Sequence, residues 1–165
     1  MIRNATENDL DKIMEIINIT VKDMETEGNN QWDEAYPNRD IFIKDIKNNY
    51  LYLIEEEDIK GVICLNYIEA DEYKNINWSL ESKALVIHRM AVNSKFRNQG
   101  IGSKLLEFAK SLAKENNIKI IKTDTYSKNI KMDNLFRKLN FKQIGVVNFN
   151  GKEKYFFCYE NLVNL

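Results

Sequence analysis

The sequence predicts an α/β fold built on a mixed, mostly antiparallel sheet. Apolar residues recur at helical spacing in some segments and in short strand-like runs in others, in the order β-α-α-β-β-β-α-β-α-β-β. A strand at 84–92, a helix at 100–116 and a strand at 118–125 follow one another, and such a crossover makes its two strands parallel. The other strands follow one another through hairpins or stand apart. We therefore expect them to pair antiparallel.

The N-terminal part is expected to hold one short strand and two helices. The strand covers residues 2–5. Thr6 and Asp9 then have the spacing of a capping box, in which side chains satisfy free amides at a helix start. Apolar residues at helical spacing predict a helix from about residue 7 to residue 26. Asn38 is placed to cap a second helix.

Strand patterns dominate after residue 50. A strong hairpin turn signal, Asn150-Gly151, lies near the C-terminus. The expected elements are hairpin strands at 50–55 and 59–67, a polar loop at 69–82, a strand at 84–92, a helix at 100–116, a strand at 118–125, a helix at 129–139, and strands at 141–148 and 152–160.

Length and composition restrict the class of protein. The 165 residues fit a single domain spanning 1–165. The 24 Lys and Arg residues are balanced by 25 Asp and Glu, so no basic excess predicts a nucleic-acid partner. No apolar run approaches the roughly 20 residues of a membrane span, and Cys64 and Cys158 cannot build a disulfide framework. We expect a cytoplasmic monomer or homodimer without a metal or a membrane partner.

The segment Arg97-Asn98-Gln99-Gly100-Ile101-Gly102 stands between an expected strand and an expected helix. Glycine allows a ligand close to the backbone, and the first helical turn has unpaired N–H groups with a partial positive charge. This arrangement suits a pyrophosphate. The Walker pattern does not fit, because Gly102-Ser103-Lys104 reverses its order, and Leu105 stands where the Rossmann pattern needs a third glycine.

The same segment matches the R/Q-x-x-G-x-G/A pattern of the GCN5-related N-acetyltransferase (GNAT) family. It follows Ile87-His88-Arg89-Met90-Ala91-Val92, and the stretch from Asn129 to Phe141 is similar to the family's N…A/M…L-Y-x-K-x-G-F signature. The chain therefore resembles this family over nearly its whole length. The resemblance implies a sheet flanked by helices on both faces, with a central parallel pair that splays apart. It also implies acetyl transfer from acetyl-CoA to a primary amine by direct attack in a ternary complex.

The resemblance also implies which residues hold the cofactor. Met90, Ala91 and Val92 would pair with the pantetheine arm, and the N–H near Met90 would polarise the thioester carbonyl. Asn129 matches a position that contacts the cofactor. Phe136 occupies the cofactor-side position of a tyrosine that many members use to protonate the thiolate. The pyrophosphate would be held by Arg97, Asn98, Gln99, Gly100, Ile101, Gly102 and Ser103.

The usual proton-transfer groups of the family are missing, because Phe136 replaces the tyrosine and Val86 replaces a strand glutamate. His88 is the single histidine, and its ordinary pKa would let it act as a base; the alternative is a structural role. Tyr126 could protonate the thiolate, or its ring could pack against the following helix. Activation by water alone and unaided loss of the thiolate are a further alternative, because a CoA thiol leaves readily.

The acceptor is expected to be a small-molecule or peptide amine. Trp32 and Tyr36, together with the acidic and aromatic segment 69–81, could form the rim of its pocket, since such groups suit a cation. Asp124 could hold or deprotonate the amine, or pair locally. Two other functions stay open: a non-catalytic acyl-CoA sensor, and a different phosphate-ligand enzyme such as a nucleotide binder.

Overall fold

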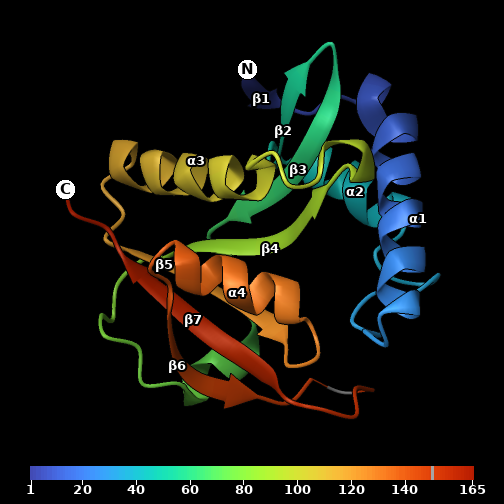
Figure 1. Ribbon diagram of the computed structural model, residues 1–165. Coiled ribbons are helices and arrows are strands. Elements are labelled where there is room, and N and C mark those ends of the chain that lie inside the picture. The colour runs from blue at the N-terminus through green and yellow to red at the C-terminus, as the bar shows by residue number, and fades with distance from the viewer. Residues whose placement is uncertain (150) are drawn as a thin grey trace. The chain divides into compact units, whose positions relative to one another are not determined.

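The computed structural model describes residues 1–149 and 151–165, and its strands follow the hydrogen-bonded order β1-β2-β3-β4-β5-β7-β6 (Figure 1). This confirms the α/β class and the expected order of helices and strands. The strands are β1 (Ile2–Asn4), β2 (Leu51–Glu56), β3 (Asp58–Asn66), β4 (Leu85–Val92), β5 (Ile120–Tyr126), β6 (Lys142–Val147) and β7 (Phe156–Leu162). The helices are α1 (Leu10–Thr26), α2 (Arg39–Lys47), α3 (Ile101–Glu115) and α4 (Ile130–Lys138), with short 3-10 turns η1 (Glu7–Asp9), η2 (Asp71–Asn75) and η3 (Ser94–Phe96).

The chain divides into two compact units, which we describe separately. The first unit consists of Met1–Leu65 and Arg89–Leu105, and the second of Asn66–His88 and Leu106–Leu165. Strand β4 and helix α3 each contribute residues to both units. The expectation of one domain over the whole chain stays a prediction.

In the first unit, helices lie on both faces of the sheet. Helices α1 and α2 pack on one face of β2 and β3. On the other face the N-terminal turn of α3 lies against Gly61, where an added Cβ would come within 3.0 Å of Ile101 and 3.1 Å of Leu105. This close approach explains the glycine in β3. The core on the side of α1 and α2 includes Ile13, Ile17, Phe42, Leu51, Leu53, Val62 and Cys64.

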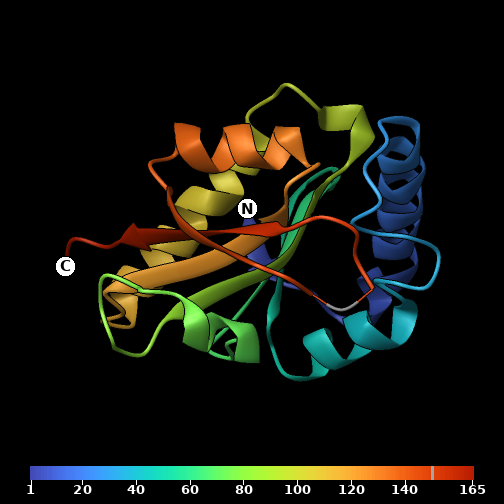
Figure 2. The same cartoon turned by 90° about the horizontal axis from the view of Figure 1, so that it is seen from below.

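In the second unit, β4 and β5 are parallel, which confirms the crossover prediction. Their ladder pairs Leu85–Ile87 with Ile121–Thr123, and β7 pairs antiparallel with both β5 and β6. Helix α4 covers one side of these strands, and the segment 66–84 covers the other (Figure 2). The core under this segment includes Tyr73, Val86, Tyr126, Val147, Phe156 and Cys158.

The last strand begins at Phe156, four residues later than the expected start. The residues before it bond elsewhere: Lys154 N–H donates to the Tyr126 hydroxyl at 3.2 Å, and Tyr155 C=O accepts from Ser127 N–H at 2.9 Å. Alternating side chains could not reveal these bonds. The expected turn includes Asn150, which lies outside the described residues.

Candidate functional site

The loop between β4 and α3 is fixed at its base by Asn93. Its side-chain amide donates to Ile59 C=O at 2.8 Å, and its Oδ1 accepts from Lys95 N–H at 3.1 Å. Asn98 and Gly100 then adopt left-handed conformations, with φ of 61° and 74°, that turn the chain into the helix. Asn tolerates such values better than most residues, and glycine has no steric penalty there.

The start of α3 is accessible. Arg97 to Gly100 are exposed, Gly102 and Ser103 are half-buried, and a Cβ at Gly100 would meet nothing within 4 Å. The first intrahelical bond runs from Lys104 N–H to Gly100 C=O at 3.0 Å, so the amides before Lys104 need other partners. An accessible turn whose amides cannot be paired within the helix fits a pyrophosphate.

Arg97 of this loop has a side-chain charge partner. Its guanidinium forms an ion pair with Asp23 of α1, and both side chains are more than one-third exposed. Exposed pairs of this kind contribute little to stability, because water competes for both charges. The guanidinium can therefore exchange its partner at small energetic expense.

The β4 residues that the resemblance assigns to pantetheine lie in the first unit. Met90 and Val92 are half-buried, and Ala91 is buried. Between them and His88, Arg89 forms a two-bond ion pair with Asp45 of α2, at 2.9 and 2.7 Å. These two bonds fix the orientation of the guanidinium.

Trp32 and Tyr36 have different surroundings within the first unit. Trp32 is buried in the core beside α1 and α2. Tyr36 is 41% exposed, and its hydroxyl accepts from Arg89 Nη1 at 3.2 Å. Of the two aromatic residues proposed to line the acceptor pocket, Tyr36 is thus the one that a ligand can reach.

His88 pairs with a buried amide. Its Nε2 lies 2.5 Å from Asn66 Oδ1, which also accepts from Ile68 N–H at 2.9 Å. A backbone N–H needs an acceptor, so this second bond fixes the orientation of the Asn66 amide. Nε2 therefore carries the proton, and in the neutral ring Nδ1 is the basic atom.

The positions of the missing family groups are packed with apolar side chains. Val86 is buried in the second unit, and Phe136 packs between the rings of Phe141 and Tyr159, with centroids at 5.4 and 5.0 Å. Tyr126 is fully buried, and its ring lies 4.9 Å from Phe156. Its hydroxyl accepts the bond from Lys154 described above.

Asn129 and Asp124 both make well-defined polar contacts. Asn129 Oδ1 caps α4 by accepting from Met132 N–H at 3.2 Å. Asp124 Oδ2 accepts from the Tyr73 hydroxyl at 2.5 Å. Burial raises the pKa of Asp124 to about 6, although the bond from Tyr73 acts in the opposite direction.

The two buried thiols are not suited to act as nucleophiles. Burial raises the pKa of Cys64 and of Cys158 to about 12, and both are free and buried. Both cysteines therefore act as small core residues. Among residues 1–149 and 151–165, no group of three or more His, Cys, Asp and Glu side chains is arranged to hold a metal ion.

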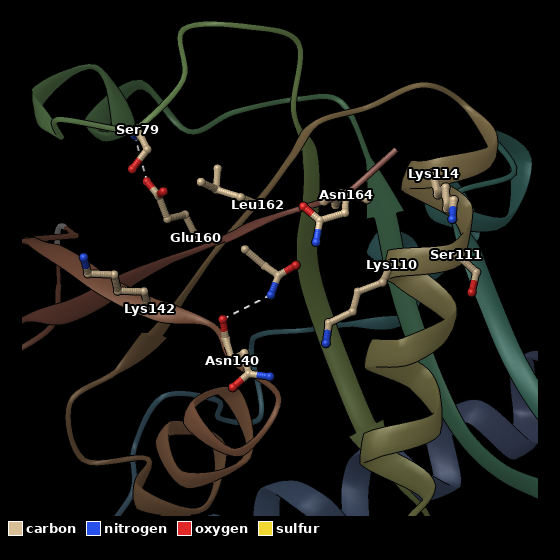
Figure 3. Close-up of a pocket in the computed structure, with 11 residues that line it drawn as sticks. Ser79, Lys110, Ser111, Lys114, Asn140, Lys142, Glu160, Leu162 and Asn164 are labelled. Atoms are coloured by element: carbon tan, nitrogen blue, oxygen red, sulfur yellow. Dashed lines mark hydrogen bonds between the residues drawn. The ribbon is translucent and has the colours of Figure 1, made fainter.

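A cavity of about 610 Å³ lies in the second unit (Figure 3). Three lysines line it, Lys110, Lys114 and Lys142, and Glu160 faces it while accepting from Ser79 N–H at 2.9 Å. Ser79, which belongs to the segment 69–81 predicted for the acceptor rim, lines this cavity, and none of the individually predicted site residues does. In the described part of the chain, no helix combines the length and apolarity that crossing a membrane requires.

Sequence patterns did not reveal four polar partners of the predicted residues, namely Asp23, Asp45, Asn66 and Tyr73. Tyr73 and Asp124 lie 51 positions apart, and Arg89 and Asp45 lie 44 apart. No sequence periodicity links such distant positions. The acidic and aromatic character of segment 69–81 was the one available signal, and it included Tyr73.

Comparison with known proteins identifies the family. The acetyltransferase (GNAT) family model matches residues 13–141. An acetyltransferase of this family from Streptococcus agalactiae superposes with a TM-score of 0.88 at 27% identity, covering 100% of this chain and 96% of that one. The yncA protein of Salmonella typhimurium, whose structure holds its cofactor acetyl-CoA, gives a TM-score of 0.72 at 15% identity, covering 99% and 94%.

A curated N-acetyltransferase is also similar to this chain in sequence. The uncharacterized N-acetyltransferase YesJ of Bacillus subtilis is 19% identical over 145 residues, which is 86% of this chain and 81% of that protein. The family match covers most of the chain and includes the β4–α3 loop described above. This protein belongs to the GNAT acetyltransferase family.

Proposed function

We propose that the protein transfers the acetyl group of acetyl-CoA to a primary amine, by direct attack in a ternary complex. The observation that carries this proposal is the accessible first turn of α3, entered through the left-handed Asn98 and Gly100. The family membership, and the acetyl-CoA held by the Salmonella typhimurium protein, support it.

In this proposal the backbone from Arg97 to Ser103 binds the pyrophosphate. Met90, Ala91 and Val92 offer main-chain groups to the pantetheine arm, and Met90 N–H donates to the carbonyl oxygen where negative charge develops. When bound, acetyl-CoA supplies an acetyl group activated as a thioester. The chain's contribution to rate is then mostly orientation and a fixed N–H dipole.

In this proposal His88 removes the proton from the amine. With Nε2 held as a donor to Asn66, Nδ1 is the atom that can accept a proton, directly or through water. Tyr126 is less suited to protonate the thiolate, because its hydroxyl is buried and bonded to Lys154 N–H. The thiolate can leave unaided, because a CoA thiol is a good leaving group.

The cofactor site is tested by replacing Gly102 with Val. The added side chain would keep the pyrophosphate away from the first-turn amides, so we expect the dissociation constant of CoA to rise about tenfold or more. Gly102→Ala is the matched variant and should show a smaller rise. The measurement is calorimetric titration with CoA, beside thiol release from acetyl-CoA over a panel of amines. Unchanged CoA affinity in Gly102→Val contradicts this placement.

A non-catalytic acyl-CoA sensor is the second candidate. The observation that favours it is the apolar packing of Val86 and Phe136, at the positions where family members place proton-transfer groups. This function predicts that CoA stabilises the protein against heat, and that no amine in the panel causes thiol release. Release with any amine above the uncatalysed rate excludes it.

A further inference from the structure

The segment 66–84 is joined to the strands of the second unit by polar side chains. Lys122 Nζ pairs with Glu69 at 2.7 Å and lies 4.6 Å from the centroid of the Trp78 ring. Tyr73 donates to Asp124 at 2.5 Å. Lys122 and Asp124 are alternate residues of β5, so they face the segment from the same side of the sheet.

Tyr73 is fixed in position by its own surroundings. It is 2% exposed, its ring lies 5.1 Å from that of Trp78, and Trp78 Nε1 donates to its backbone C=O at 2.9 Å. Burial and the neighbouring Asp124 raise the pKa of Tyr73 well above its usual value. The hydroxyl therefore stays protonated and acts as a donor.

One oxygen of Asp124 is left open. Oδ2 accepts from Tyr73, and among residues 1–149 and 151–165 no donor reaches Oδ1. In the same part of the chain, no buried side-chain oxygen lacks a partner. An oxygen without a partner is thus one that solvent reaches, and Asp124 is partly exposed. Oδ1 can therefore accept a bond from a ligand.

The strand register brings this carboxylate and His88 to the same end of the parallel ladder. The ladder ends at the pair Ile87–Thr123, and His88 and Asp124 are the residues that follow on the two strands. By alternation they share the face of Val86 and Lys122. A group bound to Asp124 would therefore lie on the same side of the sheet as the proposed base.

The charges around Asp124 favour a cation. Lys122 is already paired with Glu69, and the charge of Glu72 raises the pKa of Asp124 further. From the other side, Cys158 of β7 pairs in register with Asp124 and is a neutral thiol. Tyr73 also contacts the carboxylate, and His88 is a further titratable group on this face.

We propose that Asp124 Oδ1 binds the protonated amino group of the acceptor, and that Tyr73 is a positioning residue that orients the carboxylate and keeps it ionised. This inference rests on the proposed function and narrows its acceptor to a cationic alkylamine. His88 then takes the proton from the bound ammonium, which leaves the neutral amine as the nucleophile.

Kinetics with two probe amines test this assignment. n-Butylamine is an ammonium at pH 7.5, whereas O-methylhydroxylamine is uncharged. Asp124→Asn should raise the KM for n-butylamine about tenfold or more, with little change for the uncharged amine or for acetyl-CoA. Equal effects on both amines would overturn the assignment.

Tyr73→Phe tests the positioning role. Without the donated bond, the pKa of Asp124 should rise further, so the acidic limb for n-butylamine should move upward by roughly half a pH unit or more. The matched control is Tyr159→Phe, which also removes a buried hydroxyl bonded to a carboxylate, Asp133, at 2.5 Å. Its acidic limb should stay in place.

A titration of the Asp124 carboxyl carbon by NMR gives a readout that needs no turnover. Its midpoint should lie near pH 6 in the wild type, rise in Tyr73→Phe and fall when n-butylamine is added. If the wild type acetylates amines but these midpoints do not move, the inference fails and the proposed function stands. If no amine causes thiol release, the proposed function and this assignment both fail.

Discussion

The side chain of Asn66 determines which nitrogen of the His88 ring carries a proton. Because Asn66 Oδ1 already accepts from Ile68 N–H, it can only accept from His88 as well. A single amide on β3 thus selects the tautomer of the candidate base. Such control by a hydrogen-bond partner is common where the orientation of an imidazole matters.

Replacing His88 with Gln separates this bond from the basicity of the ring. Glutamine can still donate to Asn66 Oδ1, but it has no basic nitrogen. We expect kcat/KM to fall roughly a hundredfold or more, while the unfolding temperature stays near that of the wild type. Steady-state kinetics and thermal unfolding check both parts.

The control for His88→Gln lies on the neighbouring strand. Thr123→Val removes the bond from Thr123 Oγ1 to Ile87 C=O at 3.0 Å. It should lower the free energy of unfolding by about 1 kcal/mol and leave turnover per folded molecule unchanged. A fully active His88→Gln would show that the histidine is structural.

At the scale of elements, two helices begin in the same way. Asn38 Oδ1 accepts from Ile41 N–H at 3.1 Å at the start of α2, and Asn129 Oδ1 accepts from Met132 N–H at 3.2 Å at the start of α4. Both side chains satisfy an amide that the helix itself cannot pair. The family resemblance adds a cofactor contact for Asn129 alone.

The two caps therefore form a matched pair of variants. Asn38→Ala and Asn129→Ala should each lower the free energy of unfolding by about 1 kcal/mol, as measured by urea denaturation. Only Asn129→Ala should also weaken CoA in a titration. Equal CoA affinity in the two variants would limit Asn129 to its capping role.

Elements with strong local signals could be predicted from the sequence. The helix starts at Asn38 and Asn129 and the parallel crossover around α3 follow from caps, periodicity and chain order. The start of β7 could not, because Lys154 bonds to the side chain of Tyr126 instead of continuing the strand.

Some parts of the candidate site are easier to predict from the sequence than others. The glycine-containing loop carries its proposed chemistry in consecutive residues, so it could be recognised from the sequence alone. The surroundings of Asp124 and Arg89 depend on partners more than 40 positions away. Only the folded chain brings those pairs together. The packing of Trp32 in the core likewise depends on residues that are distant in the sequence.

At the scale of the whole molecule, Asp124 opposes folding. Its pKa is 3.8 as a free side chain and about 6 in the fold, so the folded state binds this proton more tightly than the unfolded chain does. Its contribution to the free energy of unfolding therefore decreases as the pH rises between these values. Asp9 acts in the opposite sense: the Arg3 bond lowers its pKa to about 2, so its stabilisation is lost only below about pH 4.

Asp124→Asn should therefore be more stable than the wild type at neutral pH. We expect the difference in free energy of unfolding between Asp124→Asn and the wild type to grow between about pH 4 and pH 6. It should reach about 1 kcal/mol once partial exposure of the carboxylate is allowed for. Urea denaturation over a pH series measures it. A constant difference across this range would mean that Asp124 titrates normally.

The placement of Trp32 and Trp78 has a practical consequence. The chain has two tryptophans; Trp32 is buried in the first unit, and Trp78 stands beside Lys122 in the second. Each compact unit thus holds one tryptophan. Tryptophan emission excited selectively reports on the first unit alone in Trp78→Phe and on the second unit alone in Trp32→Phe, so the melting of each can be followed optically without a label.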